Sequence, residues 1–477
     1  MAVVVLMRLS ACKQVLVAAL LAAALLSGLP AAAAGGGLMD QFERSVGAGA
    51  VPELVKAYGG EYHPSIWERQ WVDEVFQRLV DVSSRKHAIE YSLTVLNSME
   101  LNAFALPGGF VFITRGMLRD LKGDQDRLAA VLGHEIAHVE LKHGINSVLR
   151  QLGMTVLVEV GMIWLDLGNA EVVRVASQTL LQVLRLGWGR EAEYEADLLG
   201  QKLAAAAGFD PAGAVMLVDY LLSIESTERS TDIFSTHPPS KARRERVLQE
   251  LANFWGEPVK LGETDVREVL DDGRRCASEP RKDVMGRFTA ELRPGANGDT
   301  VLVVHDAQLE EERQWLGNLP ARAAEWSPTG EYLAVVVDTE DGQAVWLLDR
   351  FGRVAHQWRQ YEGARVALLE WDPAGRRLAY VVDDGQLSQL LVGYIPGQVS
   401  VVIQAGTSFA DLCWVEDGSS VAYSDGSDWY VVHGPRTQSV VLANPVPQVV
   451  ERRSFLAPTV ESDGETIRLT RPQLAWP

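Results

Sequence analysis

A five-residue motif in an apolar stretch places the strongest constraint on this chain. Residues 134–138 read His-Glu-Ile-Ala-His, within residues 128–143, whose apolar side chains recur at helical spacing. Positions four residues apart lie one above the other on a helix, so His134 and His138 can present ring nitrogens to one Zn²⁺ ion. The carboxylate of Glu135 can act on a water molecule beside that ion. This pattern is typical of a zinc hydrolase.

A catalytic zinc site takes three protein ligands and keeps a fourth position open, so a third ligand must come from elsewhere. Residues 190–197 read Arg-Glu-Ala-Glu-Tyr-Glu-Ala-Asp and open a second helical pattern. Two pairs of carboxylates four residues apart could each lie on one face of that helix: Glu193 with Asp197, or Glu191 with Glu195. Residue spacing alone does not choose between these pairs.

Taken together, these motifs resemble the zinc metalloendopeptidases that include HtpX, BepA, the Oma-type proteases and the CAAX prenyl endopeptidases. The resemblance covers about residues 40–255. It extends to residues 102–109, 208–211 and 236–239 and to Arg243. It implies an α+β fold: a mainly helical zincin-type metallopeptidase domain with a small edge-exposed β-sheet, holding one Zn²⁺ per chain. It also implies that Glu193 is the third ligand, and that Asp197 and Arg190 support the ligands without touching the metal.

Two further residues, His237 and Arg243, match family positions near the metal. We expect them to stabilise the negative oxygen that develops as a peptide bond is hydrolysed, with Glu135 as the general base. His237 could equally be a fourth, inhibitory ligand that restrains the enzyme until substrate arrives. His143 lies five residues beyond His138, a rotation of about 140° on a continuous helix, so we interpret it as structural or surface. Glu191 and Glu195 are interpreted as exposed.

The apolar and β-branched residues 110–114 predict a strand, and the glycines before it suit a sheet edge next to the cleft. An extended peptide could add to that edge, which would require little of its sequence. Phe110, Val111 and Phe112 are therefore the predicted substrate-binding residues, and the resemblance implies that Asn102 helps to position substrate or backbone there. A buried structural strand is the alternative.

The N-terminal residues follow the pattern of a signal peptide. Arg8 and Lys13 precede an apolar run at residues 15–26, and small residues follow it, so we predict a cleaved signal over residues 1–34 and a periplasmic or otherwise exported protein. Retention as a membrane anchor by residues 15–34 is the alternative. Residues 153–165 are apolar but short for a span, so we predict a core helix, or else one that covers the groove or lies on a membrane surface.

Composition limits the possible partners. The formal net charge of −19 argues against nucleic acid. Apart from a cysteine in the predicted signal, the chain has Cys276 and Cys413, which could form one disulfide in an oxidising compartment. We expect protein or peptide substrates and no membrane span in the mature chain, which leaves peripheral membrane association open.

The second half carries a repeat. After a predicted peptidase domain over residues 40–255 and a linker over 256–284, similar segments begin at Trp326, Trp371 and Trp414, spaced by 45 and 43 residues. This period suits a four-stranded blade, and the pattern resembles the blades of TolB-like β-propellers. We therefore predict an all-β, propeller-like domain over residues 285–477, with a β-sandwich as the alternative.

The sequence thus predicts a zinc metalloendopeptidase of envelope protein quality control, acting on unfolded or misassembled proteins. The β domain would bind substrate, an envelope partner or the peptidase domain itself. The competing hypothesis is a non-catalytic envelope binding or assembly factor, in which zinc is structural and the propeller carries the function.

Overall fold

The computed structural model describes residues 32–121, 123–152, 170–224 and 236–261, two hairpin strands at 459–462 and 467–470, and residues 286–435 apart from 296–297, 341, 359–360, 396–397, 407 and 416–417. The predicted signal lies outside these residues except for its last three. The apolar stretch at 153–165 and Cys276 also lie outside them. Among the helices described, none is long and apolar enough to cross a membrane.

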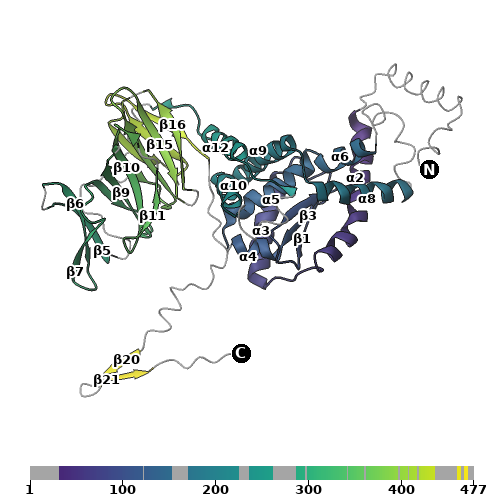
Figure 1. Ribbon diagram of the computed structural model, residues 1–477, viewed down its shortest axis with the longest axis horizontal. Helices are drawn as coiled ribbons and strands as arrows, with labels where there is room; N and C mark the ends of the chain where they lie inside the picture. The colour runs from purple at the N-terminus through teal and green to yellow at the C-terminus, as the bar shows by residue number, and fades with distance from the viewer. Residues whose placement is uncertain are drawn as a thin grey trace. The chain divides into compact units, whose positions relative to one another are not determined.

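The first part of the chain is mainly helical and surrounds a small sheet (Figure 1). Its helices are α2 (Ala32–Ala57), α3 (Ile66–Val82), α4 (Arg115–Leu121), α5 (Gln125–Glu140), α6 (His143–Gln151), α8 (Ala170–Leu186), α9 (Arg190–Ala206), α10 (Ala212–Ile224) and α12 (Lys241–Asn253). Its strands are β1 (Ser92–Leu96), β2 (Ala103–Leu106) and β3 (Phe110–Thr114). The predicted α+β class with a mainly helical domain is confirmed.

The position of β3 in the sheet corrects one prediction. The strand order is β1-β3-β2, with β3 parallel to β1 and antiparallel to β2. Both edges of β3 are therefore paired, and Val111 and Phe112 are buried while Phe110 is partly so. The prediction that Phe110, Val111 and Phe112 bind substrate at a sheet edge is wrong. The apolar run that suggested an edge reflects burial on both faces of a central strand.

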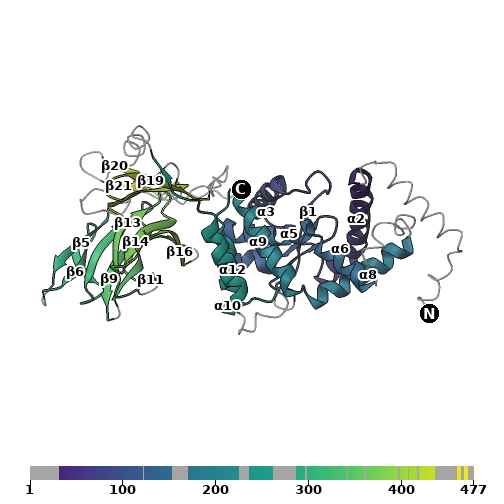
Figure 2. The ribbon, with the colours of Figure 1, turned by 90° about the horizontal axis from the view of Figure 1, so that it is seen from above.

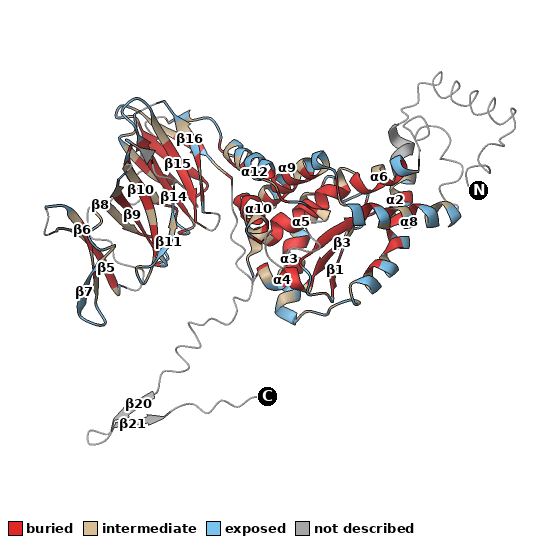
Figure 3. Ribbon diagram, in the orientation of Figure 1, coloured by how far each residue is buried: buried red, intermediate tan, exposed pale blue. Residues whose placement is uncertain are grey.

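The helix that carries the motif, α5, lies at the centre of the helical part. Asp124 caps its N-terminus by accepting hydrogen bonds from the backbone nitrogens of Asp126 and Arg127. Residues 128–139 are all buried, because α5 packs against α3, α9, α10 and β2 (Figures 2 and 3). A helix covered on every side needs small or apolar residues around its whole circumference. Residues 128–139 are all of this kind except the two histidines and the glutamate of the motif.

Two glycines set how closely α5 and α9 approach. A Cβ atom on Gly200 of α9 would lie 2.7 Å from the backbone nitrogen of His134 and 2.9 Å from the carbonyl carbon of Gly133. A Cβ on Gly133 would lie 2.9 Å from the carbonyl oxygen of Gly200. The two backbones therefore touch directly beside the first histidine of the motif.

Replacing Gly200 with alanine should lower the free energy of unfolding by about 1–3 kcal/mol, because the added methyl group meets rigid backbone rather than a movable side chain. Urea denaturation measures this change. The matched control is Gly37→Ala in α2, where a Cβ meets nothing within 4 Å and no stability should be lost. Equal urea midpoints for the two variants would show that the glycine contact does not set the helix spacing.

The second half consists of small antiparallel sheets. The first contains β5 (Phe288–Pro294), β6 (Thr300–Asp306) and β7 (Glu311–Trp315); the second contains β8 (Ala321–Trp326), β9 (Tyr332–Thr339), β10 (Gly342–Asp349), β11 (Val354–Gln357) and β12 (Tyr361–Glu362). The third contains β13 (Arg365–Trp371), β14 (Arg377–Asp383), β15 (Ser388–Tyr394) and β16 (Val399–Ala405). The fourth contains β17 (Asp411–Val415), β18 (Ser420–Ser424), β19 (Trp429–His433) and β4 (Val259–Lys260). The C-terminal strands β20 (Thr459–Ser462) and β21 (Ile467–Thr470) pair with each other.

The repeated tryptophans lie at equivalent positions in successive sheets. Trp326, Trp371 and Trp414 are buried in the strands that open the second, third and fourth sheets. The indole nitrogen of Trp371 donates to the carbonyl oxygen of Glu325 at 3.1 Å, and that of Trp414 donates to Glu370 at 2.9 Å. In both cases the acceptor belongs to the previous repeat and is the residue next to that repeat's tryptophan in the chain. The predicted all-β region is confirmed, whereas its closure as a propeller stays a prediction.

Candidate metal centre

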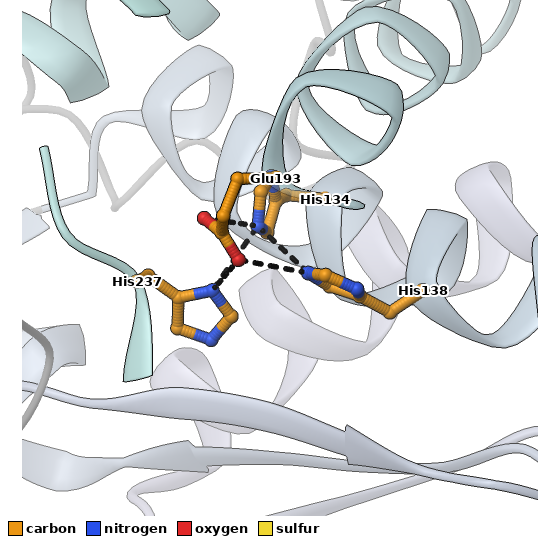
Figure 4. Close-up of side chains that lie close together, drawn as sticks. All are labelled: His134, His138, Glu193 and His237. Carbon is orange, nitrogen blue, oxygen red and sulfur yellow. Dashed lines mark hydrogen bonds and ion pairs between the residues drawn. The ribbon is translucent and has the colours of Figure 1, made fainter. Parts of the chain in front are cut away.

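Four buried side chains from three segments meet beside α5. His134 and His138 come from α5, Glu193 from the first turn of α9, and His237 from the segment before α12 (Figure 4). One donor atom from each lies within 4.8 Å of the other three. The sequence placed the two histidines on one helix face, and the structure brings them together with the other two residues.

The distances between donor atoms suit one small ion at their centre. The two Nε2 atoms of His134 and His138 are 3.1 Å apart, and Glu193 oxygens lie 3.6 and 3.5 Å from them. The Nδ1 atom of His237 is 3.2 Å from His134 Nε2 and 3.0 Å from Glu193 Oε1. Tetrahedral ligands about 2.0–2.1 Å from zinc are separated by about 3.3 Å, so the arrangement fits a zinc ion.

The chemistry of the donors agrees with this fit. Burial lowers the pKa of His138 well below its usual value, which keeps its ring neutral and able to coordinate. Burial alone would raise the pKa of Glu193, but the charges of His237 and His134 outweigh it and hold that pKa well below normal. In the absence of metal, burial lowers the pKa of His237, yet Glu193 and Glu135 raise it by more.

The carboxylate of Glu135 stands beside the donor group without belonging to it. Its Oε1 atom is 3.5 Å from Nε2 of His237, and its Oε2 atom is buried without a hydrogen-bond partner among the described residues. Burial raises the pKa of Glu135. A buried carboxylate with an unsatisfied oxygen and a raised pKa suits a group that takes up a proton.

Asp197 and Arg243 hold the donor residues from outside. Asp197 Oδ1 is 3.0 Å from Nδ1 of His134, which leaves that ring's Nε2 facing the other donors. The guanidinium of Arg243 donates to both oxygens of Asp197, at 2.6 and 2.7 Å, and its Nη1 lies 2.7 Å from Oε2 of Glu193. Asp197 thus contacts a motif histidine and Arg243, and its role in supporting the ligands stays a prediction.

The contacts of Arg243 show a positioning role that the sequence did not predict. All three of its guanidinium nitrogens already have partners, since Nη1 also donates to the carbonyl oxygen of Pro238 at 3.1 Å. Burial alone would lower the pKa of Arg243, but the carboxylates of Asp197 and Glu193 raise it by more. Arg243 therefore fixes Glu193 and Asp197, and its action on an oxyanion stays a prediction. The structure does not support the predicted role of Arg190 in holding the ligands, because this residue is exposed at the first position of α9.

His143, which we interpreted as structural or surface, and Glu195, which we interpreted as exposed, make contacts behind the site that the sequence did not predict. His143 is buried, and its Nδ1 lies 2.8 Å from Nδ1 of His138. Its Nε2 lies 3.0 Å from Oε2 of Glu195, and both Glu195 and Glu191 are exposed as expected. The contact between His143 and His138 was not predicted, because the rotation of about 140° applies only to one continuous helix through residue 143. Gly144 was the available signal, because glycine often marks an interruption.

A cavity of about 340 Å³ opens next to His237. Its apolar lining consists of Leu54, Ala57, Tyr58, Phe104, Leu181, Leu184 and Trp188, and its polar lining of Glu53, Glu100, Asn102, Arg185, Thr236 and His237. The Nδ2 atom of Asn102 donates to the Tyr58 hydroxyl at 3.0 Å. Asn102 thus lines the cavity and contacts Tyr58, the residue after α2, while its part in positioning substrate or backbone stays a prediction.

Residues 67–251 match the family model of Peptidase family M48. This segment therefore resembles the peptidase domain of that family. All four donor residues and Glu135 fall inside the matched segment, and peptidases of this family use zinc. The metal that the sequence motif predicts therefore agrees with both the donor geometry and the family.

Relatives of the chain are named as proteases. The chain is 34% identical over 216 residues to the mitochondrial metalloendopeptidase OMA1 of Schizosaccharomyces pombe, covering 44% of this chain and 61% of that protein. It is 29% identical over 294 residues to the beta-barrel assembly-enhancing protease of Escherichia coli, covering 57% and 58%. OMA1 of Arabidopsis thaliana is 28% identical over 250 residues, covering 48% and 49%. The chain thus spans about half to three fifths of these relatives.

Substituting Glu193 with alanine should remove most bound zinc from the protein, because the substitution deletes a buried anionic donor. Glu191→Ala should keep its zinc, since that carboxylate is exposed on the same helix turn. Elemental analysis of the purified variants measures the metal, and circular dichroism checks that both are folded. Equal zinc occupancy in the two would remove Glu193 from the ligand set.

Proposed function

We propose that this protein is a zinc-dependent metalloendopeptidase. The observation that carries the proposal is the convergence of His134, His138 and Glu193 on one point, with Glu135 beside them and outside the donor set. A purely structural zinc site has no use for an unsatisfied buried carboxylate next to the ion. The M48 relatives support the same activity.

Zinc held here would supply a Lewis acid that polarises the scissile carbonyl group and acidifies a water molecule. Proton transfer and the positioning of the donors depend on the protein's own residues. Glu135 accepts the proton of the attacking water and later passes it to the leaving amine, for which its raised pKa is suited. Arg243 keeps Glu193 and Asp197 ionised and fixed in place, so that the donors need not rearrange during the reaction.

The substrate would be held at the cavity beside His237 rather than along β3. β2 is no alternative edge, because all four of its residues are buried. Phe104 of β2 lines the cavity beside His237, whose largely apolar wall suits a bulky apolar side chain next to the cleaved bond. One apolar anchor favours unfolded or misassembled proteins, which expose such side chains, over a single defined sequence.

The proposed place of action is the periplasm or another exported compartment. The signal-like residues 1–34 support this location, as does the resemblance to the beta-barrel assembly-enhancing protease of Escherichia coli. The repeated sheets after residue 286 would form a propeller-like binding domain, supported by the recurring tryptophan contacts of Trp371 and Trp414. Such a domain would recruit substrate or an envelope protein.

Glu135→Gln should abolish hydrolysis while zinc and fold remain, because the carboxylate serves the water and not the metal. Casein digestion, zinc analysis and thermal unfolding of the same preparation measure the three properties. Turnover at the wild-type rate would exclude Glu135 as the base. A wild-type protein that holds zinc yet never cleaves casein would favour the alternative of a binding or assembly factor.

His237 is proposed to cap the zinc at rest, because its Nδ1 atom already lies among the donors. His237→Ala should then raise basal casein cleavage, and self-cleavage with it, while the other three residues retain zinc. If His237 were instead the oxyanion donor, the same substitution should lower turnover roughly a hundredfold or more. A large loss of activity with zinc still bound therefore contradicts the cap.

A further inference from the structure

A break in the helix places His143 directly behind a metal-binding histidine. The helix α5 ends at Glu140, Lys142 has a left-handed backbone with φ 57°, and α6 begins at His143. On a continuous helix His143 would be rotated about 140° from His138. The left-handed residue turns it back, so that the two Nδ1 atoms lie 2.8 Å apart.

The direction of the hydrogen bond between the two rings follows from the metal site. The Nε2 atom of His138 faces the donor group and needs its lone pair for the metal. The ring's proton must then sit on Nδ1, which donates it to Nδ1 of His143. A neutral His143 that accepts at Nδ1 carries its own proton on Nε2.

The proton on Nε2 of His143 has a carboxylate as its acceptor. The Nε2 atom of His143 lies 3.0 Å from Oε2 of Glu195, whose side chain is 55% exposed. Glu195 stands on α9 two residues beyond Glu193, so one helix provides both a metal donor and the outer end of this chain of hydrogen bonds. Trp188 stacks on the ring of His138 with centroids 4.8 Å apart, which restricts the ring's tilt.

We propose that His143 is a positioning residue for the metal site, holding His138 in one tautomer and one orientation, and that Glu195 fixes His143 in turn. Metal-binding histidines in proteins need a partner for their second nitrogen, and Asp197 provides it for His134. Among the described residues, Nδ1 of His138 contacts His143 instead of a carboxylate, and His143 relays the hydrogen bond to Glu195. The proposal rests on the metal site and not on peptide hydrolysis.

The test measures zinc affinity by competition with a chromophoric chelator, using the full chain. His143→Leu removes the acceptor while keeping a buried side chain of similar size, and should weaken zinc binding by about 10- to 100-fold. His143→Asn places an amide oxygen close to the position of Nδ1 and should restore most of the affinity. Glu195→Ala should weaken binding several-fold, whereas the matched Glu191→Ala should leave it unchanged.

The melting temperature of each metal-free variant separates positioning from stability. A merely structural His143 would lower that temperature in both His143 variants without changing the zinc affinity of the folded protein. Wild-type zinc affinity in His143→Leu overturns the proposal, and equally weak binding in His143→Leu and His143→Asn overturns the role of the acceptor. If His143→Leu fails to fold, wild-type affinity in the surface variant Glu195→Ala overturns the relay.

Casein cleavage is not the readout, which keeps this test separate from the proposed activity. A protein that binds zinc with the predicted order of affinities but cleaves nothing would support the positioning role and refute the peptidase. A wild-type protein that takes up no Zn²⁺ would overturn both.

Discussion

The direct backbone contact between α5 and α9 determines whether the site can exist. Gly133 and Gly200 allow the two helices to touch beside His134, which brings the first turn of α9 within reach of both motif histidines. A wider spacing would leave Glu193 short of the donor group, because its side chain has little length to spare. Close packing of two helices is thus the condition on which the metal chemistry depends.

Around that contact the side chains form two layers. The inner donors face one point, and each motif histidine is held from behind at its Nδ1 atom, His134 by Asp197 and His138 by His143. Arg243 connects the layers by contacting both Asp197 and Glu193. Such mutual fixing limits the freedom of the donors, so binding an ion requires little reorganisation.

Part of this arrangement was readable from the sequence. Helical spacing placed His134 and His138 on one face, and the resemblance chose Glu193 where spacing could not. The sequence did not show that β3 is central, because an apolar strand looks alike at an edge or in the middle of a small sheet. It also did not show that His143 contacts His138 and Glu195, since one left-handed residue at Lys142 cancels the helical geometry on which the inference relied. Arg243 was found, but its partners depend on tertiary packing.

The guanidinium of Arg243 has a consequence for the kind of ion that the site prefers. With the histidines neutral, the buried carboxylates of Glu135, Glu193 and Asp197 face a single compensating cation, and the local charge is two units negative. A divalent ion would neutralise this excess, whereas a monovalent one would leave a charge in a medium that stabilises it poorly. The protein interior therefore selects for ionic charge as well as for donor type, and Arg243 sets the balance.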